Sequence, residues 1–139
     1  RLLGDPGRIR MIWELPPEIP DTWRIPSMSV QIPVENAVKY AFDPEDEEAC
    51  IHIRVVEKQD CLFITIEDNG IGFATDTQNG QEEQGTGYGL KILCQTIDIL
   101  NSRNKNKMNF IIQDRSLLEP GGHGTLVSLV VPLDYTFDL

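Results

Sequence analysis

The sequence has little of the chemistry that supports a disulfide framework, a membrane span or a polyanion-binding surface. Its three cysteines, Cys50, Cys61 and Cys94, are an odd set without a CxxC spacing, which favours a reduced cytosolic compartment. No segment reaches the roughly 18 to 20 apolar residues of a membrane helix, and no signal segment opens the chain. Only 12 Lys and Arg stand against 22 Asp and Glu, a balance that argues against nucleic-acid or anionic-membrane binding.

The length and composition are those of one globular domain. The 139 residues are 40% hydrophobic and 24% charged, which is ordinary for a soluble protein with a single core. The chain opens at Arg1 rather than at methionine. We therefore expect residues 1–139 to be a single domain of a longer protein.

Hydrophobic periodicity predicts an alternation of strands and helices. Period-two patterns indicate strands, and a spacing of three or four apolar residues indicates helices. The predicted order is an edge strand at 8–15, a helix at 27–42, two strands within 50–68, a helix at 88–102, and strands at 108–114 and 125–133. This order predicts an α/β fold, a two-layer sandwich with the helices on one face of the sheet.

Local signals refine two of these elements. Ser27 or Ser29 is expected to cap the first helix, with Pro33 in its first turn or kinking it. A hairpin turn at Lys58 and Gln59 would place Cys50 opposite a residue near Glu67, so no disulfide with Cys61 is expected. Residues 74–86 have no large apolar side chain, which predicts a loop and suggests a lid over a ligand.

The stretch "DNGIGF" at 68–73 raises the question of why a strand should end in an acid and two glycines. Leu62, Ile64 and Ile66 share one strand face, and by parity Asp68 continues it into the buried layer. A buried carboxylate needs hydrogen-bond donors. Gly70 and Gly72 would let backbone approach a flat ligand closely. The alternative is a frayed strand end with Asp68 in an Asx turn.

Three further clusters carry possible chemistry. On the first helix Glu35, Asn36, Lys39 and Tyr40 share the face opposite the apolar arc, which is either a binding face or a solvated one with a Glu35–Lys39 pair. "GTGYGL" at 85–90 leads three alternate glycines into a helix start, a natural phosphate cradle or a hinge. "GGHGT" at 121–125 precedes the last strand and could by itself be only a turn.

Taken in order, "ENAVKY", "DNGIGF", "GTGYGL" and "GGHGT" resemble the N box and the three glycine boxes of the Bergerat ATP-binding fold. This is the nucleotide domain of gyrase, the Hsp90 chaperone, sensor histidine kinases and MutL. Over residues 10–133 the chain looks most like the catalytic domain of a LytS-type bacterial sensor histidine kinase, because "IPSMSVQIPVENAVKYAF" resembles that group's usual run. The resemblance implies a mixed sheet, ATP and Mg²⁺ as cofactors, and phosphoryl transfer to a histidine.

The resemblance also implies a role for each motif residue. Asp68 would bind the adenine exocyclic amine, Asn36 the Mg²⁺, and Lys39 a phosphate. The implied catalytic residues are Glu35 and Lys39, the metal ligand is Asn36, and the nucleotide-binding residues are Asn36, Lys39, Tyr40, Asp68, Gly70, Gly72, Gly85, Gly87, Gly89, Leu90 and Thr125. Residues 74–86 would be the ATP lid, and Gly124 would belong to the last glycine box.

Two departures bear on the partners. The only histidines, His52 and His123, do not lie on a dimerisation helix, so the phosphoacceptor helix is expected upstream of this chain. The fragment alone is then expected not to autophosphorylate. The lid has no Lys or Arg between Ala74 and Gln84. The implied full-length protein is a homodimeric inner-membrane sensor with this domain in the cytoplasm, acting on a response regulator.

Other functions of the same fold stay open at this point. An ATPase clamp of the Hsp90 or MutL type would normally continue into a transducer domain, whereas this chain ends in "VPLDYTFDL". An anti-sigma-factor serine kinase and a nucleotide-binding regulator without catalysis would share the same motifs.

Overall fold

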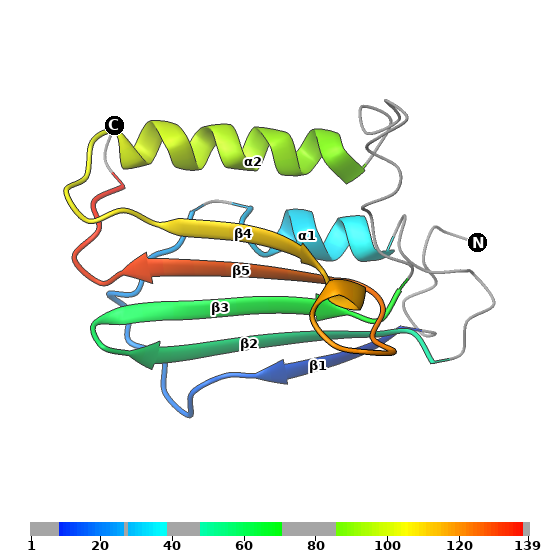
Figure 1. Cartoon of the computed structure of the whole chain (residues 1–139). Coiled ribbons are helices and arrows are strands. Elements are labelled where there is room, and N and C mark those ends of the chain that lie inside the picture. The colour runs from blue at the N-terminus through cyan, green and yellow to red at the C-terminus, as the bar shows by residue number, and fades with distance from the viewer. Residues whose placement is uncertain (1–8, 27, 39–47, 71–85, 138–139) are drawn as a thin grey trace.

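The structure is a computed structural model that describes residues 9–26, 28–38, 48–70 and 86–137. Within these residues five strands and two α-helices are present (Figure 1). The strands and helices are β1 (Arg10–Glu14), α1 (Gln31–Asn36), β2 (Cys50–Lys58), β3 (Cys61–Asp68), α2 (Thr86–Asn101), β4 (Asn109–Asp114) and β5 (Thr125–Pro132). The predicted order of elements is therefore confirmed.

The strands form one mixed sheet in the order β1-β2-β3-β5-β4. β1 runs parallel to β2 at the edge of the sheet, with Arg10 opposite Cys50 and Glu14 opposite Arg54. All the other neighbours are antiparallel. The long connection through α1 joins the parallel pair, as parallel strands require a crossover.

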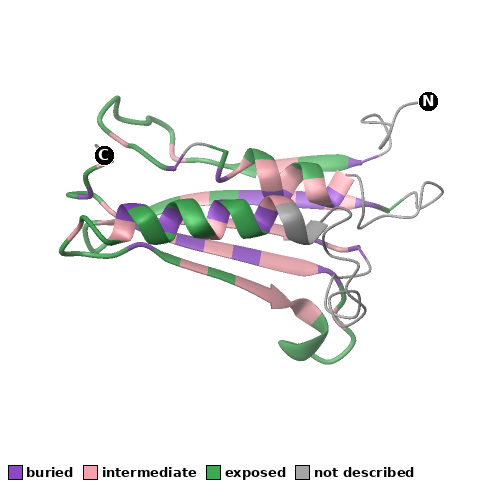
Figure 2. Cartoon of the chain, turned by 90° about the horizontal axis from the view of Figure 1, so that it is seen from above, coloured by how far each residue is buried: buried purple, intermediate pink, exposed green. Residues whose placement is uncertain are grey.

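The core lies between the sheet and the two helices, which cover the same face (Figures 1 and 2). On β3 buried and half-buried residues alternate strictly from Cys61 to Asp68, and β5 follows the same alternation from Val127 onward. The largest fully buried side chains are Ile51, Ile53, Leu62, Ile64, Leu93, Leu129 and Val131. The two-layer α/β sandwich with helices on one face is thus confirmed.

The helix α2 buries the stripe that its sequence spacing predicts. Leu90, Leu93, Ile97 and Leu100 are all 6% exposed or less. At its first turn α2 also approaches α1 closely, because a Cβ added to Gly89 would lie 3.2 Å from the Cγ2 atom of Ile32. A small residue at this position is what lets the two helices meet.

The first helix differs from its prediction. It begins at Gln31 with Val30 as N-cap, and no side chain caps it. The expectation that Ser29 is the cap is wrong: Ser29 is 2% exposed and its hydroxyl has no hydrogen-bond partner. Pro33 falls in the first turn, where its missing N–H costs no helical hydrogen bond. Ser27 and residues 39–42 of the predicted helix lie outside the described residues.

The β2–β3 turn is displaced by one residue from the predicted position. Lys58 pairs with Cys61, so the two turn residues are Gln59 and Asp60, with φ of 55° and 64°. Positive φ at both positions is the signature of a type I′ hairpin, which matches the twist of the strands. Cys50 consequently lies opposite Asn69, because Ile51 pairs with Asp68. Asn69 is two residues beyond Glu67, and Cys50 is far along the strand from Cys61, as predicted.

The cysteines and the lengths of the helices can be read from the described residues. Cys50, Cys61 and Cys94 are all among the described residues and are free cysteines. Over the described ranges, the longest helix is α2 with 16 residues, and none is both long and apolar enough to cross a bilayer.

Candidate functional site

The last residue of β3 is a carboxylate enclosed by backbone donors. Asp68 is 7% exposed and lies on the same strand face as the core residues Ile64 and Ile66, which confirms its predicted parity. The N–H groups of Gly70 and Thr125 donate to its Oδ1 atom over 2.9 Å and 3.2 Å. Both bonds end on Oδ1, so Oδ2 receives neither of them. The predicted alternative of a frayed strand end in solvent is wrong, although an Asx-type bond to Gly70 is present.

Burial sets the protonation behaviour of this group. Removal from water raises the pKa of Asp68 above its usual range, and this effect exceeds the opposing bonds from Gly70 and Thr125. The nearby Arg115 cation lowers the same pKa and the Glu67 carboxylate raises it. A buried acid with a raised pKa is a frequent mark of a functional site.

The glycine before β5 makes this arrangement sterically possible. Gly124 has a φ of 114°, and a Cβ placed there would lie 2.0 Å from the backbone oxygen of Asp68. Only glycine lets the chain pass so close to β3. The "GGHGT" segment is therefore more than a turn, because it carries the N–H of Thr125 to the carboxylate.

The turn after Asp68 is fastened on both sides. The side chain of Asn69 accepts from the N–H of Cys50 at 2.8 Å and donates to the carbonyl of Glu48 at 2.9 Å. On the other side the ring atom Nδ1 of His123 lies 3.1 Å from the carbonyl oxygen of Gly70. His123 is thus held beside the "DNG" turn, and His52 is held within β2, where its ring contacts Glu14.

One residue of this cluster, Arg115, belongs to none of the motifs that the sequence displays. Its guanidinium donates to the carbonyl oxygens of Asp68 at 2.9 Å and His123 at 3.3 Å. It also forms ion pairs with Glu67 at 3.1 Å and Glu119 at 3.3 Å. The hint in the sequence is a single Arg at the start of the glycine-rich connection between two strands, at 115–124.

The predicted residues of the helices lie toward the same end of the molecule. The C-terminal end of β3, the start of β5, the start of α2 and the end of α1 all lie at the right of Figure 1. α2 begins at Thr86, so Gly87 and Gly89 are helical and the last residue of the predicted lid belongs to α2. The first four N–H groups of a helix have no intrahelical acceptor and can bind an anion.

On α1, Glu35 is exposed and accepts a bond from the side chain of Gln31 at 3.0 Å. Asn36 is half-buried and is the last residue of α1. Leu90, in contrast, is 6% exposed and belongs to the packed stripe of α2. The predicted residues Lys39, Tyr40, Gly72 and Gly85, and the lid residues 74–85, lie outside the described residues.

Two of the cavities among the described residues border the sheet, and the first of them reaches the Asp68 cluster. This cavity has a volume of about 550 Å³, and its lining includes Asp68, Asn69 and Arg115 together with Arg10, Glu48, Ala49, Cys50, His52 and Glu67. Cys50 and His52 alternate with the buried Ile51 and Ile53, so this cavity opens on the face without helices, behind Asp68.

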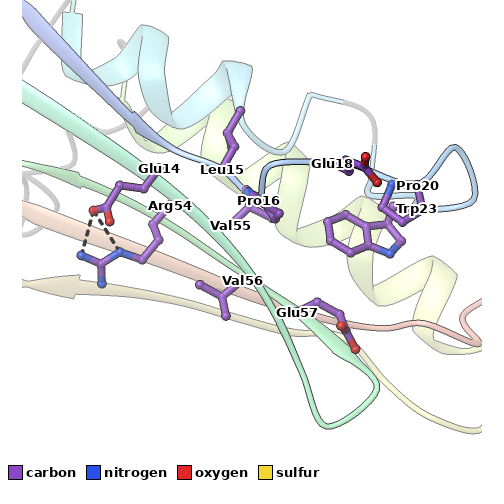
Figure 3. A pocket seen from close by; sticks show the side chains of 10 residues that line it. All are labelled: Glu14, Leu15, Pro16, Glu18, Pro20, Trp23, Arg54, Val55, Val56 and Glu57. Carbon is purple, nitrogen blue, oxygen red and sulfur yellow. Dashed lines mark hydrogen bonds and ion pairs between the residues drawn. The ribbon is translucent and has the colours of Figure 1, made fainter.

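The other cavity, of about 540 Å³, lies beyond the end of β1 (Figure 3). Its walls include Trp23 and Pro16 on one side and Val55 and Val56 on the other. Three carboxylates, Glu14, Glu18 and Glu57, and one cation, Arg54, line it. None of the predicted site residues lines this second cavity, and its excess of acid makes it unsuited to phosphates.

Comparison with known proteins places this arrangement in a family. Residues 29–135 match the model of the histidine kinase-, DNA gyrase B- and HSP90-like ATPases, so most of the chain is covered. The chain belongs to this ATPase family, and ATP is accordingly the nucleotide that its fold serves. The matched range includes α1, Asp68, the "GTGYGL" segment at the start of α2 and the "GGHGT" segment before β5.

Among curated proteins the chain resembles bacterial sensor kinases. It is 37% identical over 71 residues to the sensor protein LytS of Staphylococcus epidermidis, covering 51% of this chain and 12% of that protein. It is 36% identical over 75 residues to the sensor histidine kinase YesM of Bacillus subtilis, covering 54% and 13%. A LytS of Enterococcus faecalis is 28% identical over 117 residues, covering 80% and 18%. The aligned part is thus less than a fifth of each relative.

Solved structures agree on the fold. The histidine kinase domain of a blue-light activated histidine kinase from Erythrobacter litoralis superposes with a TM-score of 0.57 at 20% identity, covering 91% of this chain and 52% of that one. The mycobacterial sensor histidine kinase MprB gives 0.59 at 18% identity, with 91% and 83% coverage. The predicted Bergerat architecture is therefore confirmed.

Proposed function

We propose that this chain is the ATP-binding catalytic domain of a sensor histidine kinase and that it transfers the γ-phosphoryl group of ATP to a histidine of the same protein. The observation that carries the proposal is the enclosed carboxylate of Asp68, held by the backbone of two glycine motifs within a family of ATPases. The likeness to LytS and YesM sensor proteins supports the kinase branch of that family.

Asp68 is proposed to read the adenine base. Oδ1 is already bonded to the N–H groups of Gly70 and Thr125, so Oδ2 is the oxygen left to accept from an exocyclic amine. The raised pKa of this carboxyl reflects loss of water, and a bound amine would restore a hydrogen-bond donor. Gly70 and Gly72 would let the ring lie close to the backbone.

The phosphates and the metal are assigned to the helix ends. The phosphates would be held by the free N–H groups at the start of α2, by Lys39, and by the backbone of Gly85, Gly87 and Gly89. The pocket wall would be completed by Tyr40, Leu90 and Thr125. Asn36 supplies the hard amide oxygen that suits Mg²⁺, which is usually held by one or two protein ligands plus phosphate oxygens. The absence of a cluster of three metal-binding acids, histidines or cysteines among the described residues fits that mode. When bound, Mg²⁺ would neutralise charge on the transferring phosphoryl group.

Glu35 is the proposed catalytic acid–base residue beside Asn36, and Lys39 the cation on the γ-phosphate. Residues 74–86 would close over the nucleotide as a lid. The acceptor histidine would lie on dimerisation helices upstream of this chain. The whole protein would be a homodimeric inner-membrane sensor with this chain as its cytoplasmic domain, and a response regulator would be the next phosphate acceptor.

Binding is tested by titration calorimetry with ATP. Wild type should bind Mg²⁺-ATP, and Asn36→Ala should weaken binding in Mg²⁺ more than binding measured with a chelator present. Gln31→Ala, on the same helix but with only a surface bond to Glu35, is the matched control. Equal losses with and without metal would remove Asn36 as the Mg²⁺ ligand.

Transfer is tested with γ-labelled ATP. The isolated chain should stay unlabelled, because His52 is fixed in β2 and His123 is fixed against Gly70. A supplied helical hairpin with the cognate histidine should be labelled in trans, slowly, because the effective concentration of a tether is lost. Acid-labile label on the isolated chain would contradict the proposal, and acid-stable label on a serine of an added protein would instead indicate a serine kinase.

A further inference from the structure

We propose that Arg115 is a positioning residue of the nucleotide site, which aims the carboxylate of Asp68 by taking over a hydrogen bond that the sheet itself would otherwise make. The inference rests on the proposed role of Asp68 toward adenine. It concerns a residue that belongs to none of the four motifs. The argument follows from the pattern of hydrogen bonds where β3, β5 and β4 end together.

The first step is the direction of the backbone groups of Asp68. The N–H of Asn69 donates to the carbonyl of Cys50 at 3.3 Å, so Asn69 turns its backbone groups toward β2. Successive residues of a strand point these groups to opposite sides. Asp68 therefore presents its N–H and C=O toward β5.

The second step is the break in the ladder. The last β3–β5 pair is Glu67 with Leu126, and the next would be Asp68 with Thr125. In a continued ladder the N–H of Thr125 would donate to the carbonyl oxygen of Asp68. Instead it donates to the side-chain Oδ1 of Asp68 at 3.2 Å, and the carbonyl oxygen accepts from Nη1 of Arg115 at 2.9 Å.

The two bonds are thus exchanged, and Arg115 makes the exchange possible. A buried carbonyl left without a donor is costly, so the N–H of Thr125 would be drawn back to it if Arg115 were absent. That movement would take one of two donors from Oδ1 and let the carboxylate rotate. Because the guanidinium of Arg115 donates to the carbonyl oxygen of Asp68, the N–H of Thr125 stays available to donate to the Asp68 carboxylate.

The position of Arg115 is itself tightly defined. Its backbone N–H donates to the carbonyl of Gly124 at 2.9 Å from the β4 side, while its side chain reaches across the start of β5 to β3. Glu67 and Glu119 hold the guanidinium through Nε and Nη2, which leaves Nη1 aimed at Asp68 and His123. The planar fork of Arg can serve these separate acceptors at once, whereas the ammonium of Lys cannot keep the same geometry.

The test compares ATP with purine riboside triphosphate, which lacks the exocyclic amine. Wild type should prefer ATP by about 10-fold or more, the range of a hydrogen bond to a charged acceptor. In Arg115→Ala this preference should fall to within about 3-fold of unity, with the loss confined mainly to ATP. Arg115→Lys should recover only part of the preference and serves if the Ala variant is unstable.

Arg54→Ala is the matched control, because Arg54 also lies on the sheet face without helices, pairs there with Glu14, and makes no described contact with Asp68. It should retain the full preference for ATP. An unchanged preference in folded Arg115→Ala, or equal weakening of both nucleotides, would overturn the positioning role while leaving the adenine assignment intact. Absence of any ATP preference in wild type would instead overturn the assignment of Asp68 and the positioning role with it.

Discussion

The two ends of the sheet both hold hydrogen-bonded polar side chains, which are half-buried asparagines at one end and the buried Asp68 at the other. At the end away from the site, Asn101 closes α2 by bonding both the N–H and the C=O of Met108 and accepting from the hydroxyl of Tyr135 at 2.6 Å. Next to it Asn104 bonds the carbonyls of Leu100 and Thr136 and the N–H of Thr136. These neutral amides have donors and acceptors both engaged.

At the site end the buried side chain is a carboxylate with both described bonds on one oxygen. Its pKa is raised by burial, so the ionised form is held at a cost in folding free energy. The comparison teaches that a neutral amide with both its oxygen and its nitrogen engaged serves the fold, whereas a charged group with one oxygen outside these bonds points to a ligand. Changes at the first end should alter stability alone, and changes at the second should alter binding.

The largest effect is expected at Gly124. In Gly124→Ala the new Cβ would lie 2.0 Å from the carbonyl oxygen of Asp68, at a φ of 114° that L-residues rarely adopt. The free energy of unfolding should drop by about 3 to 5 kcal/mol, and ATP binding should be lost. Chemical denaturation measures the first and calorimetry the second.

Gly121→Ala is the control, because Gly121 also has positive φ, at 77°, but open space around it. It should cost only about 1 kcal/mol and leave ATP binding unchanged. Similar losses in the two variants would mean that close approach to Asp68 is not what Gly124 provides.

The next largest effect is expected at the opposite end of the sheet. Asn101→Ala removes three side-chain hydrogen bonds and leaves the backbone of Met108 and the hydroxyl of Tyr135 without these partners. We expect a loss of about 2 to 4 kcal/mol in unfolding free energy, with ATP affinity unchanged in the folded protein. Asn106→Ala, which removes one exposed bond to Asp134, should cost well under about 1 kcal/mol.

A loss of ATP affinity in folded Asn101→Ala would break the division between the two ends. It would show that the amide end of the sheet also supports the site.

The pH dependence of ATP binding should report on the Asp68 end of the sheet, because the asparagines at the other end do not titrate. Because the folded pKa of Asp68 is raised, its charge is lost at a higher pH than in an ordinary aspartate as pH falls. ATP affinity should therefore decline on acidification with a midpoint above the usual aspartate range. The stability contribution has the opposite sign: the destabilising effect of the buried charge is full above the raised pKa and disappears below the unfolded value.

Measuring the affinity for ATP at several pH values between about 4 and 7 gives this midpoint, because carboxyls with a raised pKa titrate in that range. Asp68→Asn should show a flat profile over the same range. A wild-type midpoint at or below the ordinary aspartate value would disagree with the described burial of Asp68.

The smallest expected effect lies in the hairpin turn between β2 and β3, at the end of the sheet away from Asp68 (Figure 1). Gln59 and Asp60 adopt positive φ without being glycine or asparagine. Asp60→Gly should raise the free energy of unfolding by about 1 kcal/mol, because the steric cost of the left-handed conformation is relieved. Lys58→Gly, two residues earlier and in a regular strand, should lower it instead, and thermal denaturation of the pair gives the sign of each change.

How much of the fold and of the candidate site the sequence predicts depends on how far apart in the sequence the interacting residues are. The parity of β3 predicted that Asp68 is buried, and helical spacing predicted the stripe from Leu90 to Leu100, because each pattern repeats within a few residues. The turn at Gln59 was misplaced by one residue, since neither turn residue is of the type that such turns usually contain.

The remaining features depend on contacts between distant parts of the chain. Arg115 meets Asp68 across 47 positions, and Tyr135 meets Asn101 across 34. No periodic pattern encodes such pairs, and a single Arg in a loop is normally solvated. The start of α1 was also misjudged, because Val30 precedes it with no capping side chain while Ser29 is buried without a partner.

The most direct test of the central claim is the ATP affinity of Asp68→Asn, measured by calorimetry next to its free energy of unfolding. Removing a buried charge while keeping an oxygen for Gly70 and Thr125 should leave the protein at least as stable as wild type at neutral pH. ATP affinity should fall by about 10- to 150-fold, the value of a hydrogen bond to a charged acceptor. A folded variant that binds ATP as tightly as wild type would contradict the claim that this carboxylate is the adenine-reading group.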